Sequence, residues 1–313
     1  MRLRTWLRKS HVILCEGAVI ERVRREFAFP LDAHLANAAM IYNPAGQAIL
    51  KNIYRQYLDI GQEYQLPIMI LTPTWRANQE NIALAGRHDQ DVNGDGVGFL
   101  STLRQEYGAY ARKILIGGLV GCRGDAYQPG AALAQASALA FHQCQIQALA
   151  RAGVDFLIAS TLPALSEALG IAQAMAQTGV AYILSFVVRP TGTLLDATPL
   201  AAAIAAIDHQ VTPRPLGYMA NCTHPTVLAQ ALRQSHNASE MVRSRLLGLQ
   251  ANTSPKSPEE LDGAVTLETE AADSLAEKMA AVHTEFGLKI WGGCCGTDHR
   301  HIRAMAAKCS AVK

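Results

Sequence analysis

Three of the seven cysteines are placed so that they could bind a metal ion. Cys294 and Cys295 are adjacent within a glycine run, and Cys222 lies far upstream, after Asn221. Adjacent cysteines cannot close an ordinary disulfide with each other without straining the backbone. Three thiolates around zinc leave the fourth tetrahedral position open, which is the arrangement of a catalytic site. We therefore predict that Cys222, Cys294 and Cys295 bind zinc.

Two other interpretations of these cysteines stay open at the level of sequence. One is a closed, structural zinc site in which His224 or His299 supplies the fourth ligand. Structural sites usually contain C-x₂₋₄-C pairs, and this sequence has none. The other is a set of buried thiols without metal, since free cysteine is commonly buried. The glycines that flank the cysteines argue against it.

An open zinc site with three cysteines is suited to methyl transfer onto sulfur. A free thiol is only a few per cent ionised at neutral pH, whereas zinc deprotonates a thiol that it binds. The bound thiolate stays electron-rich and could attack the methyl group of a cationic onium donor. Trp75 and Tyr127 follow the predicted second and third strands and could cradle such a cation on their rings, although packing is the alternative role.

Short apolar segments alternate with longer segments of helical period along the chain. The predicted strands are residues 11–18, 67–72, 113–120, 154–160, 181–188, 215–221, 245–252 and 288–293. The clearest predicted helices are residues 131–152, 165–178, 199–207, 226–234 and 269–286. Eight strands that alternate with helices predict an α/β fold of the (β/α)₈ TIM barrel type. An open doubly wound sheet is the alternative, but a glycine-rich phosphate turn is missing after the first strand.

In such a barrel, chemistry collects at the carboxyl ends of the strands. Cys222 ends the predicted sixth strand and Cys294–Cys295 end the eighth, so all three thiols should face the same mouth. We predict one domain, residues 1–313, with a short N-terminal lead-in helix. Residues 252–263 are expected to form a solvent loop. Residues 89–96 resemble half of a calcium-binding loop, but Leu100 stands where a glutamate is required, so we expect a solvated acidic loop.

Composition narrows the class of protein further. Of 313 residues, 50% are hydrophobic and 17% are charged, and the net charge is +2. A near-neutral chain without a basic stripe is not expected to bind nucleic acid. No apolar run is long enough for a membrane span, and the basic N-terminus lacks the cleavage pattern of a signal peptide. Cysteines without a disulfide framework favour a reducing compartment, the cytoplasm. The oligomeric state stays open.

Two motifs resemble those of the zinc-dependent homocysteine S-methyltransferase family. They are Gly-Gly-Cys-Cys-Gly-Thr at residues 292–297 and Asn-Cys-Thr-His-Pro at residues 221–225. The resemblance implies a (β/α)₈ barrel, zinc on the three cysteines, and substrate contacts from Glu16, Thr161 and Asn221. Ser160 stands where the family usually has a glutamate that holds the amino group of homocysteine. A serine cannot supply that negative charge.

The sequence as a whole thus predicts a zinc-dependent S-methyltransferase, in which Glu16, Ser160, Thr161 and Asn221 contact substrate. The acceptor is expected to be homocysteine or a related small thiol. The donor is expected to be a small onium compound of the S-methylmethionine, S-adenosylmethionine or betaine type, because folate and cobalamin modules would need a longer chain. The alternative is a zinc- or thiol-binding family member that has lost methyl transfer, an idea that Ser160 supports.

Overall fold

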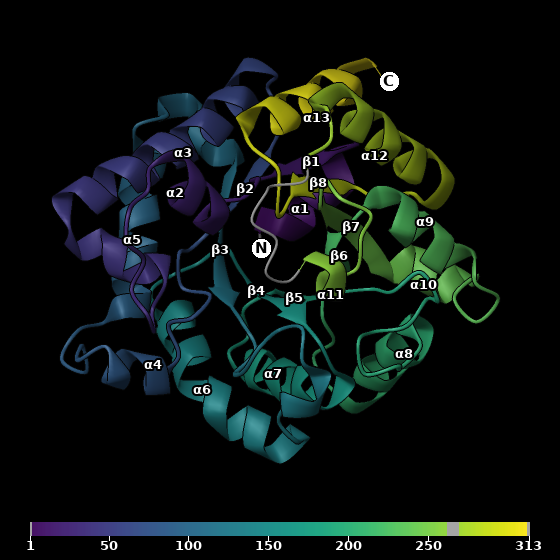
Figure 1. The fold of residues 1–313 in the computed structure, drawn as a ribbon, viewed down its shortest axis with the longest axis horizontal. Coiled ribbons are helices and arrows are strands. Elements are labelled where there is room, and N and C mark those ends of the chain that lie inside the picture. Colours follow the sequence, from purple (N-terminus) through teal and green to yellow (C-terminus); the bar gives the residue numbers. More distant parts are fainter. Residues whose placement is uncertain (1, 262–268, 312–313) are drawn as a thin grey trace.

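The computed structural model describes residues 2–261 and 269–311. Its centre is a closed barrel of eight parallel strands that neighbour one another in sequence order, surrounded by helices (Figure 1). The strands are β1 (Ile13–Cys15), β2 (Ile68–Leu71), β3 (Ile114–Val120), β4 (Phe156–Leu162), β5 (Tyr182–Phe186), β6 (Gly217–Thr223), β7 (Leu246–Ala251) and β8 (Ile290–Gly293). The predicted (β/α)₈ barrel is confirmed. The prediction that residues 1–313 form one domain is not tested at its boundaries and stays a prediction.

Helices connect each strand to the next and form the outer ring. They are α2 (Ile20–Glu26), α3 (Pro44–Glu63), α4 (Gln79–Leu84), α5 (Val92–Gln105), α6 (Gln135–Arg151), α7 (Leu165–Gln177), α8 (Leu200–Gln210), α9 (Pro225–Arg233), α10 (Glu240–Arg245), α11 (Pro258–Leu261), α12 (Ala272–Phe286) and α13 (His299–Ala311). Short 3₁₀ turns lie at η1 (Asn37–Tyr42), η2 (Gly108–Lys113) and η3 (Pro129–Ala131). Among the described residues no helix is long and apolar enough to cross a membrane.

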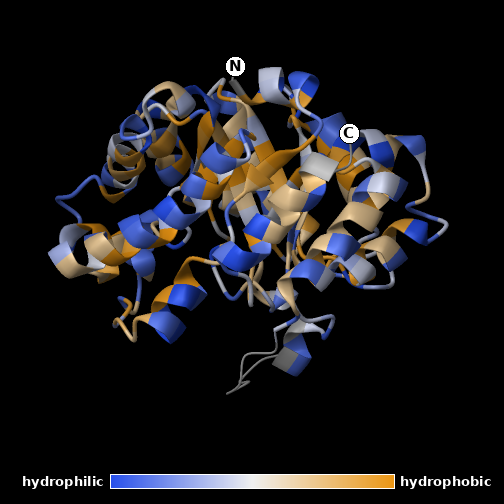
Figure 2. Ribbon diagram, turned by 90° about the horizontal axis from the view of Figure 1, so that it is seen from above, coloured by the Kyte–Doolittle hydropathy of each residue, from blue (hydrophilic) through white to orange (hydrophobic). Residues whose placement is uncertain are grey.

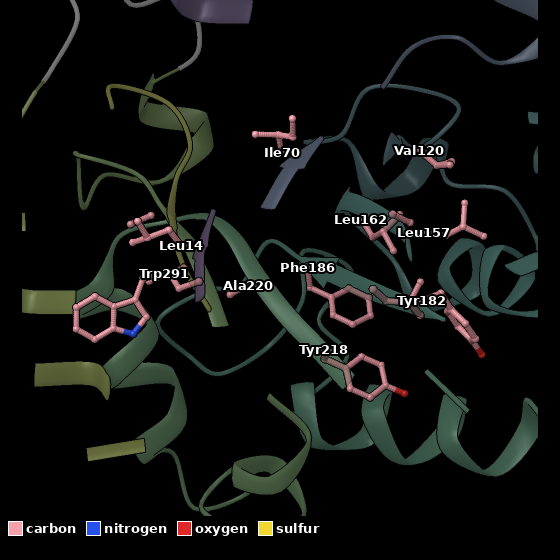
Figure 3. Close-up of a cluster of buried hydrophobic side chains, with 14 of the residues drawn as sticks. Leu14, Ile70, Val120, Leu157, Leu162, Tyr182, Phe186, Tyr218, Ala220 and Trp291 are labelled. Carbon is pink, nitrogen blue, oxygen red and sulfur yellow. The ribbon is translucent and has the colours of Figure 1, made fainter. Parts of the chain in front are cut away.

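The strands are apolar on both faces because each face is covered. Alternate side chains point inward and fill the barrel, among them Ile13, Met69, Phe156 and Ile290. The others pack outward against the helices, as Figure 3 shows for a cluster that runs from Leu14 and Trp291 to Phe186 and Tyr218. Figure 2 shows the hydrophobic strands enclosed by helices with hydrophilic outer faces. This two-sided burial explains why the strand sequences are continuous apolar runs.

The predicted lead-in helix is confirmed as α1 (Arg2–Lys9), and it lies against the interior core of the barrel. Leu3 is fully buried, and Trp6 and Leu7 pack beside it. The Lys289 ammonium, just before β8, donates to the carbonyl of Leu7. The helix therefore covers the amino-terminal ends of the strands, opposite to the mouth where chemistry is expected.

Two loop predictions were wrong in part. Residues 92–96 of the acidic segment begin α5, because Asp91 caps this helix by accepting from the Gly94 N–H. Within the described residues, this segment is not part of any cluster of metal-ligating side chains. Of residues 252–263, the first three are buried instead of solvated and 258–261 form α11. Residues 262 and 263 lie outside the described part.

Candidate metal centre

The three predicted ligand sulfurs come together at the carboxyl-terminal mouth of the barrel. The Sγ atoms of Cys222 and Cys294 are 2.7 Å apart, those of Cys294 and Cys295 are 4.0 Å apart, and all three lie within 4.8 Å of one another. Sulfurs that share a tetrahedral zinc at about 2.3 Å lie about 3.8 Å from each other. The observed separations bracket this value, so small side-chain adjustments suffice. The donor set therefore fits zinc.

The two histidines considered as a fourth ligand do not join the cluster. His224 is hydrogen-bonded through Nε2 to Glu270 and through Nδ1 to Thr226. Neither His224 nor His299 belongs to the group of potential ligand atoms, which within the described residues contains only the three cysteines. Within the described residues, the group thus offers three ligand atoms, the number expected of an open site.

Irregular strand ends aim two of the predicted site residues at the mouth. The register shifts between Ala159 and Leu162 in β4, and again between Asn221 and Thr223 in β6. Within these bulges Thr161 and Cys222 adopt φ angles of 63° and 50°. A left-handed conformation costs a non-glycine residue free energy and persists where surrounding contacts hold it. Bulges of this kind commonly redirect side chains next to active sites.

Asn221 supplies the contacts that hold both bulges. Its side chain is 2% exposed and makes four hydrogen bonds. Oδ1 accepts from the Thr161 N–H at 2.9 Å and from the Ser185 hydroxyl at 2.7 Å. Nδ2 donates to Thr161 Oγ1 at 2.7 Å and to Cys222 Sγ at 3.3 Å. With its own backbone in β6, Asn221 thus ties β4, β5 and β6 together directly beside the first ligand sulfur.

Glycines and one threonine shape the loop that carries Cys294 and Cys295. A Cβ atom on Gly293 would collide with the Thr297 side chain, and Gly296 has a φ of 82° and lies against Thr253. The Thr297 hydroxyl donates to the Cys294 carbonyl at 2.7 Å and accepts from the Ala18 N–H at 3.1 Å. Thr297 therefore fixes the cysteine loop to the segment after β1. We did not predict a role for this residue.

Thr297→Val should loosen the cysteine loop, because valine has nearly the shape of threonine but no hydroxyl group. Removing the hydroxyl leaves the buried Ala18 N–H without its partner, so we expect the free energy of unfolding to fall by about 1–2 kcal/mol. Zinc affinity should fall about 10-fold, because residues that position ligands tune metal binding. Urea unfolding and competition with a zinc chelator measure the two effects. Thr102→Val, at an exposed threonine in α5, is the control. Equal zinc affinity in both variants would contradict the role of Thr297.

Of the three thiols, that of Cys222 loses its proton most readily. Hydrogen bonds from the Cys294 and Cys295 thiols, with support from Asn221, hold the pKa of Cys222 well below its ordinary value. The pKa values of Cys294 and Cys295 are raised, chiefly by their hydrogen bonds to the Cys222 sulfur. A cluster that ionises readily at Cys222 favours a divalent cation.

A cavity of about 440 Å³ opens onto the sulfurs. The four predicted substrate-contact residues all line its wall, namely Glu16, Ser160, Thr161 and Asn221. Trp75 and Tyr127 line it as well. The same wall includes Arg24 and Arg25 of α2, which sequence reasoning did not single out. Each of these residues follows or ends a strand, or lies in the helix after β1.

Glu16 is buried at the end of β1 and is held by the neighbouring strand. Its Oε2 accepts from the Leu71 N–H at 2.7 Å. Burial raises the pKa of Glu16 well above its usual range, and the hydrogen bond from Leu71 opposes this only in part. The carboxyl group therefore resists ionisation.

The raised pKa of Glu16 predicts a pH-dependent stability difference. A carboxyl whose pKa is higher in the folded state favours folding fully below its unfolded pKa of about 4.3, and this contribution is lost as pH rises through the folded pKa. Glu16→Gln keeps the hydrogen bond but cannot ionise. We expect the variant to gain stability over the wild type as pH increases above about 5. Urea midpoints at several pH values measure this; a difference that does not grow with pH would contradict it.

A (β/α)₈ barrel whose mouth presents three cysteine sulfurs beside a cavity defines a class of metal-dependent barrel proteins. Within that class, the model of the homocysteine S-methyltransferase family matches residues 13–309. The chain therefore belongs to the homocysteine S-methyltransferase family.

Similar proteins agree with this assignment. Homocysteine S-methyltransferase of Escherichia coli is 24% identical over 330 residues, which cover 98% of both chains. Methionine synthase of Mycobacterium tuberculosis is 26% identical over 295 residues, covering 87% of this chain. The chain spans only 22% of that methionine synthase and 13% of the one from Mycobacterium leprae. The activity of those longer proteins is thus not carried over as a whole.

Solved structures show the same fold. The oxidised form of the homocysteine methyltransferase MmuM from Escherichia coli superposes with a TM-score of 0.78 at 22% identity, over 98% of this chain and 99% of that one. The metallated form of MmuM gives a TM-score of 0.76 over 98% and 100% of the two chains.

Proposed function

We propose that this protein transfers a methyl group from a small onium donor to the sulfur of homocysteine or a related thiol, at a zinc centre formed by Cys222, Cys294 and Cys295. The observation that carries the proposal is the convergence of three cysteine sulfurs within 4.8 Å, at the mouth of the barrel and on the wall of a cavity. Membership of the homocysteine S-methyltransferase family supports the same reaction.

When bound, zinc would keep the acceptor sulfur in its nucleophilic thiolate form at neutral pH. The side chains of the cavity position the sulfurs and contact the substrates. Asn221 and Thr161 keep the sulfurs and the floor of the cavity in place. Glu16 and Ser160 line the same cavity and are proposed to contact the acceptor. The reaction then forms a bond between the acceptor sulfur and the methyl carbon, while the donor leaves as a neutral sulfide or amine.

A cationic donor suits the walls of this cavity. The sulfur cluster ionises readily at Cys222, and Trp75 and Tyr127 line the cavity beside it. Aromatic faces near a negative centre attract sulfonium and quaternary ammonium groups. We therefore propose donors of the S-methylmethionine, S-adenosylmethionine or betaine type.

The test is an assay of zinc-loaded protein with homocysteine and each of these donors, together with metal analysis. We expect about one zinc per chain and formation of methionine with at least one donor. Bound zinc without turnover on any thiol would instead support the alternative, a zinc- or thiol-binding family member that has lost methyl transfer. A protein that binds no zinc would contradict the proposed zinc-dependent reaction.

We further propose that the protein acts in the cytoplasm on small molecules, without nucleic acid or membrane partners. All seven cysteines are free, as is usual in a reducing compartment. The near-neutral net charge of +2 gives no basis for binding a polyanion.

A further inference from the structure

We propose that Arg24 binds the carboxylate of the methyl acceptor, and that no ion pair holds an amino group on that acceptor. The acceptors would then be small thiols with a carboxylate, for which an α-amino group is dispensable. This inference rests on the proposed function and specifies the substrate class of the same cavity.

Arg24 is an unpaired cation on the cavity wall. It is exposed near the carboxyl end of α2 and lines the cavity that contains the three sulfurs. Its neighbour Arg25 is paired with Glu21 at 3.3 Å, and Arg22 is paired with Glu26 at 2.6 Å. Within residues 2–261 and 269–311, by contrast, no carboxylate pairs with Arg24. Its guanidinium group is therefore available for a ligand.

Among the described residues, the two carboxylates on the cavity wall are already engaged. Glu21 accepts from the Gly296 N–H and from Arg25, which ties α2 to the cysteine loop. Glu16 accepts from the Leu71 N–H in a fully buried position that disfavours its charged form. Neither side chain offers the accessible negative charge that would hold an ammonium group by an ion pair.

Ser160 is a second polar group that has no partner. It is 6% exposed and lines the cavity, and its Oγ makes no hydrogen bond within the described residues. A buried hydroxyl is costly to leave unsatisfied, so a ligand atom is its natural partner. A neutral hydroxyl can donate to a carboxylate or bond to an uncharged group, but it cannot neutralise an ammonium. Arg24 and Ser160 together therefore favour an anionic, oxygen-bearing ligand.

The acceptor gains more from Arg24 than the donor does. An acceptor that binds as a thiolate and also has a carboxylate carries two negative charges. Every onium donor carries a positive charge at its reacting end, which an arginine repels. Because Coulomb energy follows the net charge that faces the guanidinium, the acceptor is the better partner.

Three thiols test the proposal with the zinc-loaded protein: homocysteine, the same thiol without its amino group (γ-mercaptobutyrate), and the same thiol without its carboxylate (homocysteamine). We expect kcat/KM for γ-mercaptobutyrate to lie within about threefold of that for homocysteine. For homocysteamine it should fall about 10-fold, the size of a charge-assisted contact at a partly solvated site. A loss of more than about 10-fold with γ-mercaptobutyrate would overturn the proposal.

The variant Arg24→Gln should act only on acceptors with a carboxylate. We expect KM for homocysteine and γ-mercaptobutyrate to rise about fivefold to 10-fold, and this rise to shrink with added salt. KM for homocysteamine and for the donor should not change. Arg8→Gln, at an exposed arginine of α1 at the far end of the barrel, is the matched control. A change in the donor KM alone would show that Arg24 binds the donor and would overturn the proposal.

Binding measurements test the role of Arg24 even if the protein transfers no methyl group. Calorimetric titration of wild type and Arg24→Gln with the three thiols should give the same order of affinities as the kinetic assay. Turnover without this order would overturn the carboxylate inference and leave the proposed function standing. The expected order of affinities without turnover on any donor would overturn the proposed function and support the inference.

Discussion

Cys294→Ser should lower methyl transfer by about three orders of magnitude and abolish stoichiometric zinc binding. The serine oxygen is a poor replacement for one of three sulfurs that lie within 4.8 Å of one another. Without the metal, a free acceptor thiol is only a few per cent ionised at pH 7, which alone costs about 30-fold. Lost positioning of the acceptor accounts for about another 100-fold. Zinc per chain and methionine formation measure the two effects.

Cys144→Ser is the matched control for this variant. Cys144 is an exposed cysteine of α6, so the change removes one thiol without touching the mouth of the barrel. This variant should keep wild-type zinc content and activity within about twofold, as surface substitutions usually do. If Cys294→Ser retained both zinc and activity, the three-cysteine centre would be wrong.

The second large effect is expected at Asn221, which binds no metal itself. Asn221→Ala removes the partners of the Thr161 N–H and of the Ser185 hydroxyl, and it removes a donor to Cys222 Sγ. Leaving buried polar groups unpaired should lower the free energy of unfolding by about 2–4 kcal/mol. Because Cys222 would lose its fixed position, we expect kcat to fall about 100-fold. Urea unfolding and steady-state kinetics measure the two changes.

Asn93→Ala separates loss of stability from loss of positioning. Asn93 is also a buried asparagine, and its Nδ2 donates to the Ala77 carbonyl at 2.9 Å within the helical layer. The control should lose stability but keep kcat at temperatures where it is folded. Similar kcat values for the two folded variants would show that Asn221 supports the fold and not the centre.

The barrel and the sulfur cluster could be predicted from sequence because both follow from simple regularities. Each strand is buried on two faces and so reads as an apolar run, as β2 and β3 do. In a parallel barrel, residues at the carboxyl ends of strands share one mouth. Cys222 and Cys294 therefore meet even though 72 residues separate them.

The features that sequence did not reveal depend on contacts between distant segments. Thr297 acts through Ala18, and Asn221 acts through a bulge in β4 that no local pattern announces. Arg24 lines the cavity because of where α2 lies. The prediction of a loop at residues 89–96 failed for a local reason, because Asp91 caps α5 by accepting from the Gly94 N–H.

If three cysteine sulfurs hold zinc and leave one position for the acceptor, X-ray absorption at the zinc edge of the purified protein should show it, without and with homocysteine. We expect three sulfur neighbours at about 2.3 Å and one lighter neighbour in the free protein, and four sulfur neighbours after homocysteine is added. A zinc environment with four protein ligands that homocysteine leaves unchanged would contradict this expectation.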